Sequence, residues 1–354
     1  MENDGEDQSM RKVKWGVLGT ADIARGATIP GMLQAEHCEL YAIAGRKAEK
    51  AADYQRAFGF QKAYSSYDEL LKDPEVEAVY IPLPNDLHCE WTLKALKARK
   101  HVLCEKPMAV SERQAAEMFR TAEENGMYLM EAYAYLHNPL ITAVKHELDT
   151  GIIGDIRYLE SAFIGGLPKQ GDYRWRREAG GGAAYDLGCY ALTMALWMLG
   201  KEPQNVRASA QYCGQEVDMF TNVLLTFEDG VIANLDCGML SGTRRLDRFR
   251  VLGTRGEIWS PVEFNQSGEI PYTVVHDGKA ETKVVSVPNN YMLEIEQLGR
   301  CVRGKEAPHI TPAFSLMAAR TMDRILKDIG FRSGMPAGKS GIIFENWLSK
   351  NRKI

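Results

Sequence analysis

Residues 13–24 decide the fold, and their sequence is VKWGVLGTADIA. The first six of them are mostly apolar, with β-branched and aromatic side chains, which is typical of a strand covered on both faces. Gly19 then permits a tight turn, and the small residues Ala21 and Ala24 allow a ligand or a packed helix to approach closely. A strand that passes through such a turn into a helix predicts the start of a βαβ series.

The chain continues this pattern to about Glu131, because short β-type runs alternate with helix-type runs. The alternation predicts a parallel sheet with right-handed crossover helices. Predicted strands are Val13–Leu18, Glu39–Ala44, Ala78–Ile81, His101–Cys104 and Tyr128–Met130. Helix boundaries are marked by two capping-box serines and one terminal glycine, at Ser66, Ser111 and Gly126.

The rhythm changes after about Asn138, where a helix-like segment and a strand precede a glycine-rich loop. A helix at Ala183–Leu199 follows, and alternating apolar residues then predict an antiparallel sheet from about Val206 to Val287. Two further helices are predicted near Tyr291–Val302 and Pro312–Asp328. The fold class is therefore α/β, with an N-terminal Rossmann dinucleotide-binding domain and a C-terminal α/β domain that has a large, mostly antiparallel sheet. The predicted bounds are 11–131 for the first domain, 132–332 for substrate binding and oligomerisation, and 333–354 for a tail.

Composition agrees with two domains of a soluble protein: the chain has 354 residues, 45% hydrophobic, 25% charged, and a net charge of −4. It lacks the basic excess of a nucleic-acid binder, so no nucleic-acid partner is expected. The seven cysteines are dispersed without C-x-x-C spacing, which predicts buried free thiols and no metal site. Met1–Ser9 is acidic and polar, and no apolar run could span a bilayer, so we expect a cytoplasmic protein without a membrane partner.

The turn after the first strand occupies the position of a dinucleotide-binding turn, although Ala21 replaces the usual second glycine. The alternative is a simple tight βα turn. Predicted cofactor contacts here are Gly19, Thr20, Ala21 and Ile23. After the second strand, Arg46 stands where NAD enzymes usually have a carboxylate, which favours NADP over NAD. Alternatively, Arg46 stacks on adenine or begins a helix in solvent.

Two loops follow later strands at the same sheet edge, where open α/β folds bind ligands. Residues 81–88 (IPLPNDLH) predict cofactor contacts at Pro82, Leu83, Asn85 and His88, or else a merely capped turn. Residues 105–107 (EKP) bring a lysine, Lys106, to that edge. A partly desolvated lysine has a lowered pKa suited to proton transfer, whereas a lysine on the surface would be inert.

A third motif, residues 173–190 (YRWRREAGGGAAYDLGCY), leads three glycines into a helix. Asp186 and Tyr190 are four residues apart and would share one face of that helix. Together they could hydrogen-bond a substrate hydroxyl and relay its proton, or they could form a structural contact.

In this order, G-x-A-x-x-A, P-x-P-N-x-x-H, E-K-P and G-G-G-x-x-x-D-x-G-x-Y resemble the Gfo/Idh/MocA family, named after glucose–fructose oxidoreductase and inositol dehydrogenase. The resemblance extends from Lys12 to about Gly330. It implies hydride transfer between NAD or NADP and a secondary alcohol or carbonyl carbon of a sugar, glycoside, inositol or related cyclic diol. It also implies a homo-oligomer formed through the sheet of the second domain.

The resemblance further implies roles for individual residues. Lys106 would hydrogen-bond the reacting oxygen, with Glu105 holding it in place, and Asp186 would orient the substrate. Many members have histidine at the position of Tyr190, whereas the subgroup of glucose–fructose oxidoreductase and dimeric dihydrodiol dehydrogenase has tyrosine, as this chain does. Tyr190 would act as acid/base beside Lys106. Arg174 and Trp175 match positions near substrate and cofactor.

Residues 131–139 (EAYAYLHNP) resemble the family's E-A-F-M-Y-R-x-H-P, a segment that borders the substrate pocket, and Tyr135 is a predicted substrate contact. Leu136 and Asn138 depart from that pattern, which indicates an unusual substrate. Two other functions stay open: a non-catalytic sensor of nucleotides or sugars, and a glycosidase-like enzyme that oxidises its substrate transiently with NAD.

Overall fold

The computed structural model describes residues 11–213, 217–240, 245–261 and 264–331. The chain forms two compact units, and each is described by itself. The first contains the described residues up to 138 together with 287–316, and the second contains those of 139–286 and 317–331. The predicted division into domains at residue 131 stays a prediction, and the segment 287–316 belongs to the first unit rather than continuing the second.

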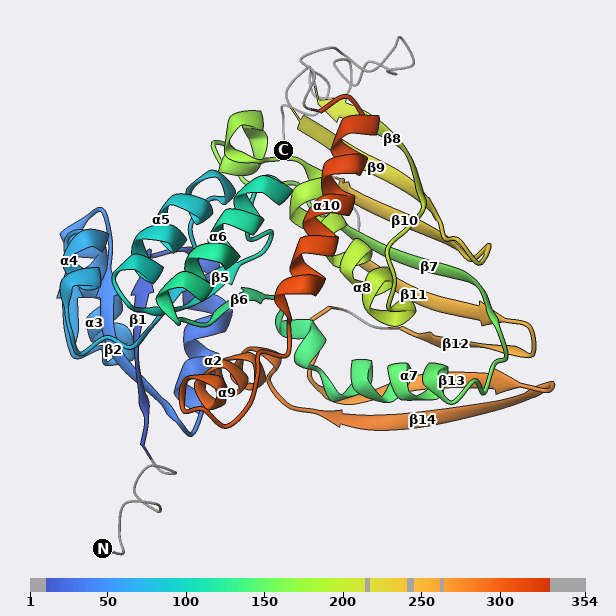
Figure 1. Ribbon diagram of the computed structural model, residues 1–354, viewed down its shortest axis with the longest axis horizontal. Coiled ribbons are helices and arrows are strands. Elements are labelled where there is room, and N and C mark those ends of the chain that lie inside the picture. Colours follow the sequence, from blue (N-terminus) through green and yellow to red (C-terminus); the bar gives the residue numbers. More distant parts are fainter. Residues whose placement is uncertain (1–10, 214–216, 241–244, 262–263, 332–354) are drawn as a thin grey trace, which may run out of the picture. The chain divides into compact units, whose positions relative to one another are not determined.

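The first unit contains a six-stranded parallel sheet in the order β3-β2-β1-β4-β5-β6 (Figure 1). Its strands are β1 Val13–Leu18, β2 Cys38–Ala44, β3 Lys62–Tyr64, β4 Ala78–Ile81, β5 His101–Glu105 and β6 Leu129–Ala132. This order confirms the predicted Rossmann fold. The sequence pattern missed β3, because its three half-buried edge residues carry no apolar run.

Short helices connect these strands, and their boundaries follow the local signals in the sequence. They are the π-helix η1 Ala24–Thr28, α2 Ile29–Gln34, α3 Ala48–Phe58, α4 Tyr67–Lys72, α5 Asn85–Lys97 and α6 Glu112–Asn125. Ser66 and Ser111 accept the N3 amides of α4 and α6, and Gly126 ends α6 in the left-handed region, as predicted. The 3-10 helix η2 Ala134–His137 and the helix α9 Asn290–Val302 also belong to this unit.

The second unit is built on an eight-stranded sheet in the order β14-β13-β12-β11-β7-β10-β9-β8. Its strands are β7 Ile156–Gly165, β8 Asn205–Cys213, β9 Val217–Thr226, β10 Ile232–Met239, β11 Leu246–Gly253, β12 Gly256–Ser260, β13 Gly268–His276 and β14 Lys279–Val287. The sheet is mostly antiparallel, as predicted, but β7 and β10 pair in parallel.

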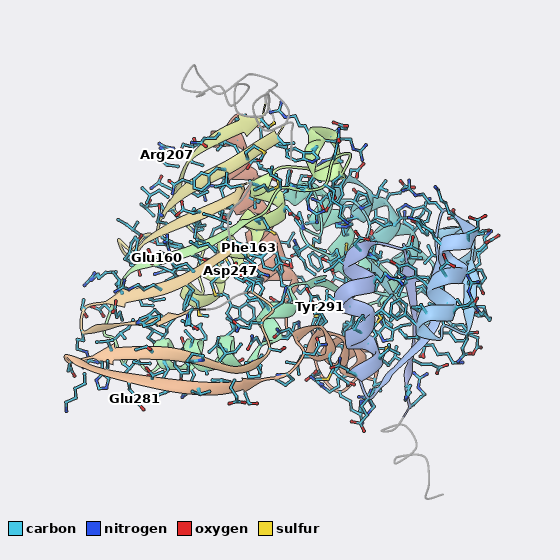
Figure 2. The ribbon with its side chains drawn as sticks, turned by 180° about the vertical axis from the view of Figure 1, so that it is seen from behind. Glu160, Phe163, Arg207, Asp247, Glu281 and Tyr291 are labelled. Carbon is cyan, nitrogen blue, oxygen red and sulfur yellow. The ribbon has the colours of Figure 1, made fainter. Side chains whose placement is uncertain are left out.

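Helices cover one face of this second sheet (Figure 1). They are α7 Pro139–Asp149, the π-helix η5 Ala184–Gly188 with α8 Cys189–Leu199, and the part of α10 Pro312–Asp328 that lies in the second unit. Short 3-10 helices, η3 Tyr173–Trp175 and η4 Arg177–Ala179, precede η5. The other face carries exposed and half-buried side chains, among them the labelled Glu160 and Arg207 (Figure 2).

Helices able to cross a bilayer are absent from the described residues, because none combines the necessary length and apolar character. The cysteines are free thiols; all are buried except Cys213, which is half-buried.

Candidate functional site

The glycine turn lies at the carboxyl end of β1, beside β4, where the strand order reverses direction. Gly19 has φ +135°, and its N–H donates to the Ala44 carbonyl at 2.9 Å. A Cβ atom on Gly19 would lie 3.1 Å from the Leu83 side chain. The turn therefore requires glycine, and it joins three of the strand ends at which this fold binds dinucleotides.

Gly19 is buried, whereas the other predicted residues of this turn are at least partly accessible. Thr20 and Ala21 are half-buried and Ile23 is 40% exposed. Arg46 is exposed beyond β2 and interacts with Tyr67. Burial raises the pKa of Tyr67, and the positive charge of Arg46 acts to lower it. A small-residue turn at the switch point, with a cation one strand away, fits the pyrophosphate and ribose end of a dinucleotide.

Pro82 and Leu83 are buried in the loop from β4 into α5, and Asn85 is buried at the first position of α5. His88, in the first turns of α5, is fully buried, and its two ring nitrogens face carbonyl oxygens. Nδ1 lies 2.9 Å from the Pro107 oxygen and Nε2 lies 2.7 Å from the Leu83 oxygen. His88 thus ties the loop after β4 to the E-K-P loop after β5. Burial lowers the pKa of His88, and a neutral imidazole donates to only one carbonyl at a time.

Lys106 follows β5 and is half-buried, and the peptide bond from Lys106 to Pro107 is cis. Its neighbour Glu105 accepts the Lys106 N–H at 3.2 Å and a short hydrogen bond from the Tyr80 hydroxyl. Thr28 in turn donates to the Tyr80 oxygen at 2.9 Å. These hydrogen bonds connect the start of the lysine loop to β4 and η1, and the role of Glu105 in holding Lys106 in place stays a prediction.

Two further buried carboxyl groups adjoin this loop, and the sequence motifs had assigned neither a role. Glu131, at the end of β6, accepts the Met108 N–H at 2.9 Å. Burial raises the pKa of Glu131 to about 7, against the opposing effects of that hydrogen bond and of the Lys106 charge. Glu294 of α9 is 1% exposed, and burial together with the Glu105 charge raises its pKa well above the usual range. Glu294 was missed because α9 is distant in sequence.

The second group of predicted residues lies in the second unit, around the start of helix 184–199. The Arg174 Nε donates to Asp186 at 2.9 Å, and its Nη1 lies 3.2 Å from Asp172. Trp175 donates through Nε1 to the Lys169 carbonyl at 3.0 Å. Arg174 therefore holds the Asp186 carboxylate in a defined orientation, a contact the sequence had not indicated.

Tyr190 is half-buried in an aromatic cluster on the helix-covered face of the sheet. Its ring centroid lies 5.2 Å from those of Phe163 and Phe264. The Arg245 guanidinium lies 4.6 Å above the Phe163 ring and forms an ion pair with the buried Asp247. Figure 2 shows Phe163 and Asp247 on neighbouring strands, and this cluster positions the phenol ring from one side.

The predicted helix of residues 183–199 differs in its first turn, which is a π-turn over Ala184–Gly188 before the α-helix begins. Gly188 packs against Cys237, whose Sγ would lie 2.9 Å from a Cβ at that position. Asp186 lies within the π-turn and Tyr190 in the α-helix, so their separation does not follow regular α-helical geometry. π-turns occur frequently at functional sites, and η1 after the Gly19 turn is another.

The structure thus gathers the predicted residues into two groups, one in each compact unit. The first contains Gly19, the loop at 82–88 and Lys106, while the second contains Arg174, Asp186 and Tyr190. Tyr135 is buried in η2, with its ring edge-to-face against Tyr133. The pairing of Lys106 with Tyr190 across the units stays a prediction.

Comparison with known proteins gives a match in each half of the chain. A family model described as "Oxidoreductase family, NAD-binding Rossmann fold" matches residues 13–133, and one described as "GFO/IDH/MocA C-terminal domain" matches residues 141–259. A D-xylose 1-dehydrogenase (NADP(+)) from Haloferax volcanii is 34% identical, over 88% of this chain and 95% of its own length.

A trans-1,2-dihydrobenzene-1,2-diol dehydrogenase from Mus musculus is 31% identical, over 90% of this chain and 97% of its own. Among solved structures, the 3-ketoreductase KijD10 from Actinomadura kijaniata, in complex with NADP and TDP-benzene, superimposes with a TM-score of 0.85. It is 32% identical, and the superposition covers 90% of this chain and 98% of KijD10.

Proposed function

Because this chain belongs to the GFO/IDH/MocA oxidoreductase family, we propose that it transfers a hydride between a nicotinamide cofactor and a secondary hydroxyl or carbonyl carbon of a sugar, glycoside, inositol or related cyclic diol. The observation that carries the proposal is the half-buried Lys106 at the end of β5, in the same sheet edge as the Gly19 turn. Relatives named as xylose and dihydrodiol dehydrogenases, and a ketoreductase, support this range of substrates.

The cofactor would be held by the Gly19 turn, with Arg46 favouring the 2′-phosphate of NADP. When bound, the nicotinamide would supply the hydride acceptor or donor. Lys106 would hydrogen-bond the reacting oxygen of the substrate. Tyr190 would take the hydroxyl proton in the oxidative direction and return it in the reductive direction. Asp186, oriented by Arg174, would hold the substrate hydroxyl.

The proposal is tested by following absorbance at 340 nm with NAD and NADP separately, over a panel of sugars, glycosides, inositols and cyclic diols. We expect turnover with NADP to exceed turnover with NAD. Cofactor binding without any absorbance change across the panel would instead identify a sensor. Release of free sugar from a glycoside without net NADH would identify a glycosidase-like cycle.

Removal of the proposed acid–base groups should lower turnover far more than removal of the same groups elsewhere. Lys106→Ala and Tyr190→Phe should each lower kcat by about 10²- to 10⁴-fold, the usual contribution of positioned acid–base groups. Matched controls are Lys97→Ala, on the exposed end of α5, and Tyr158→Phe, on β7. Wild-type kcat in both site variants would refute the mechanism.

A further inference from the structure

We infer that Asp218 is a positioning residue, whose buried carboxylate on β9 holds the first turn of helix 184–199 and thereby orients Asp186 and Tyr190. The inference rests on the proposed function for its effect on catalysis. Its structural part concerns the second unit alone.

The contact that carries the inference joins a strand of the sheet to the start of the helix. Asp218 is fully buried, and its Oδ2 accepts the Ala184 N–H at 2.7 Å. The same oxygen accepts the Thr221 hydroxyl at 2.7 Å. A carboxylate at a helix start satisfies an amide that has no partner within the helix, and its negative charge is favourable there. Here the carboxylate comes from a neighbouring strand rather than from the chain before the helix.

The glycine loop before the helix fits this carboxylate closely. Gly182 has φ +104°, and a Cβ at that position would lie 2.1 Å from Asp218 Oδ1. A Cβ on Gly181 would lie 2.4 Å from the Arg174 carbonyl oxygen. The space beside these two glycines is thus taken by Asp218 and by the Arg174 backbone. This internal packing therefore requires glycine at both positions.

The held turn is connected directly to the predicted site residues. The Gly182 carbonyl accepts the Asp186 N–H at 3.1 Å, and the Gly182 N–H donates to the Arg174 carbonyl at 3.0 Å. The Arg174 side chain in turn forms an ion pair with Asp186. A shift of the backbone at Gly182 or Ala184 would therefore move both partners of that pair.

Apolar packing on both sides of the same turn provides a second anchor. Ala183 and Leu187 form a buried cluster with Cys237 and Met239 of β10, and Gly188 also packs against Cys237. The turn is consequently held to β9 through hydrogen bonds and to β10 through apolar packing. Without Asp218 the Ala184 amide would lose this acceptor, and the apolar packing does not constrain the direction of that amide.

The experiment compares Asp218→Ala with three other variants. Asp218→Asn keeps an acceptor oxygen for Ala184 and is expected to fold if the alanine variant does not. Thr221→Val removes the other donor but keeps the Ala184 bond. Asp73→Ala removes a buried carboxylate of the first unit that accepts the Lys62 and Tyr64 side chains, and it serves as the control for general loss of stability.

Two measurements are made on the full chain: steady-state kinetics with NADP binding, and hydrogen exchange of peptides covering 181–190. Asp218→Ala should lower kcat by about 10- to 100-fold, as expected when catalytic groups are misplaced, with an unchanged Kd for NADP. Exchange of the amides at 184–188 should accelerate by about 10-fold, as expected for a lost helix cap. In Asp218→Asn and Thr221→Val, kcat should fall less and amide exchange should accelerate less than in Asp218→Ala. Asp73→Ala should change neither kcat nor the exchange of these amides.

Wild-type kcat and protection in Asp218→Ala would overturn the inference, as would equal losses in Thr221→Val and Asp218→Ala. If Asp218→Ala does not fold, the other two variants decide. The inference would be overturned if Asp218→Asn kept the wild-type kcat and exchange rates while Thr221→Val lost kcat and protection. If the wild-type protein turns over no substrate, the proposed function fails, while the exchange measurement still decides whether Asp218 holds the turn.

Discussion

Buried carboxyl groups accept backbone N–H groups close to the residues that carry the proposed chemistry. Glu131 accepts the N–H of Met108, two residues after Lys106, and Asp218 accepts the N–H of Ala184, two residues before Asp186. Burial raises the pKa of Glu131 to about 7 and that of Asp218 to about 6. In both places a side chain from another element orients the backbone beside a reactive group.

The raised pKa of Glu131 makes stability depend on pH in a definite direction. The folded state favours the protonated carboxyl, so this contribution is fully present below the unfolded pKa of 4.5 and is lost as pH rises through about 7. A shift of this size corresponds to a loss of about 3 kcal/mol at most. Glu131→Gln should therefore lose less unfolding free energy between pH 4.5 and pH 8 than the wild type.

Urea unfolding at the two pH values measures this difference. The free energy of unfolding in Glu131→Gln should change less with pH because glutamine does not titrate. Parallel pH profiles in the two proteins would contradict this, because they would show that the pKa of Glu131 is the same in the folded and unfolded states. His88, also buried at this loop, makes stability depend on pH in the opposite direction: burial lowers its pKa, so its contribution is lost as pH falls.

At the scale of elements, the contact between α2 and α9 attaches a distant segment to the first unit. Gly31 of α2 faces α9, and a Cβ there would lie 2.7 Å from the Tyr291 Cβ and 2.8 Å from the Met292 nitrogen. Because backbone atoms cannot move aside cheaply, the two helices can approach so closely only at glycine. This packing brings Glu294 to the neighbourhood of Glu105.

Gly31→Ala should therefore destabilise the protein by about 1–3 kcal/mol, the usual cost of overpacking. The matched variant is Gly26→Ala in η1, where no atom lies within 4 Å of the added Cβ. That control should be neutral or slightly stabilising, because alanine is the better helix former. Thermal unfolding of both variants makes the comparison, and equal changes in Tm would contradict the packing argument.

At the scale of the whole molecule, the uncovered face of the second sheet is the expected oligomer interface. Apolar side chains on this face are exposed: Leu224 40%, Ile232 38%, Leu246 41%, Trp259 39% and Val284 58%. They alternate along their strands with the buried residues of the helix-covered face. Apolar sheet faces of this kind tend to associate, so we predict a homo-oligomer in solution.

Charged substitutions on this face should dissociate the oligomer. Trp259→Glu combined with Val284→Lys would place charges among the apolar side chains, and burying them unpaired is costly. Light scattering should give a multiple of the chain mass for the wild type and the monomer mass for the double variant. Arg157→Ala, at an exposed arginine near the start of β7, is the control. A monomeric wild type would refute the prediction.

Local chemistry was sufficient for much of the fold and for part of the candidate site. The serines at 66 and 111, the bounds of α10 and the glycine turn at Gly19 depend on neighbours within a few residues, and each was predicted from the sequence. The E-K-P and glycine-rich motifs likewise identified Lys106, Asp186 and Tyr190 as candidates, because their spacing relative to strands and helices is a local property.

Long-range contacts account for what the sequence pattern missed. The pairing of β7 with β10, the place of α9 in the first unit and the carboxylates behind the motifs all join residues far apart in the chain. Asp218 illustrates the reason, since an aspartate in a strand pattern gives no sign of the Ala184 amide 34 residues away. Which backbone amide a buried carboxylate accepts depends on which elements pack together, and that is a property of the folded chain.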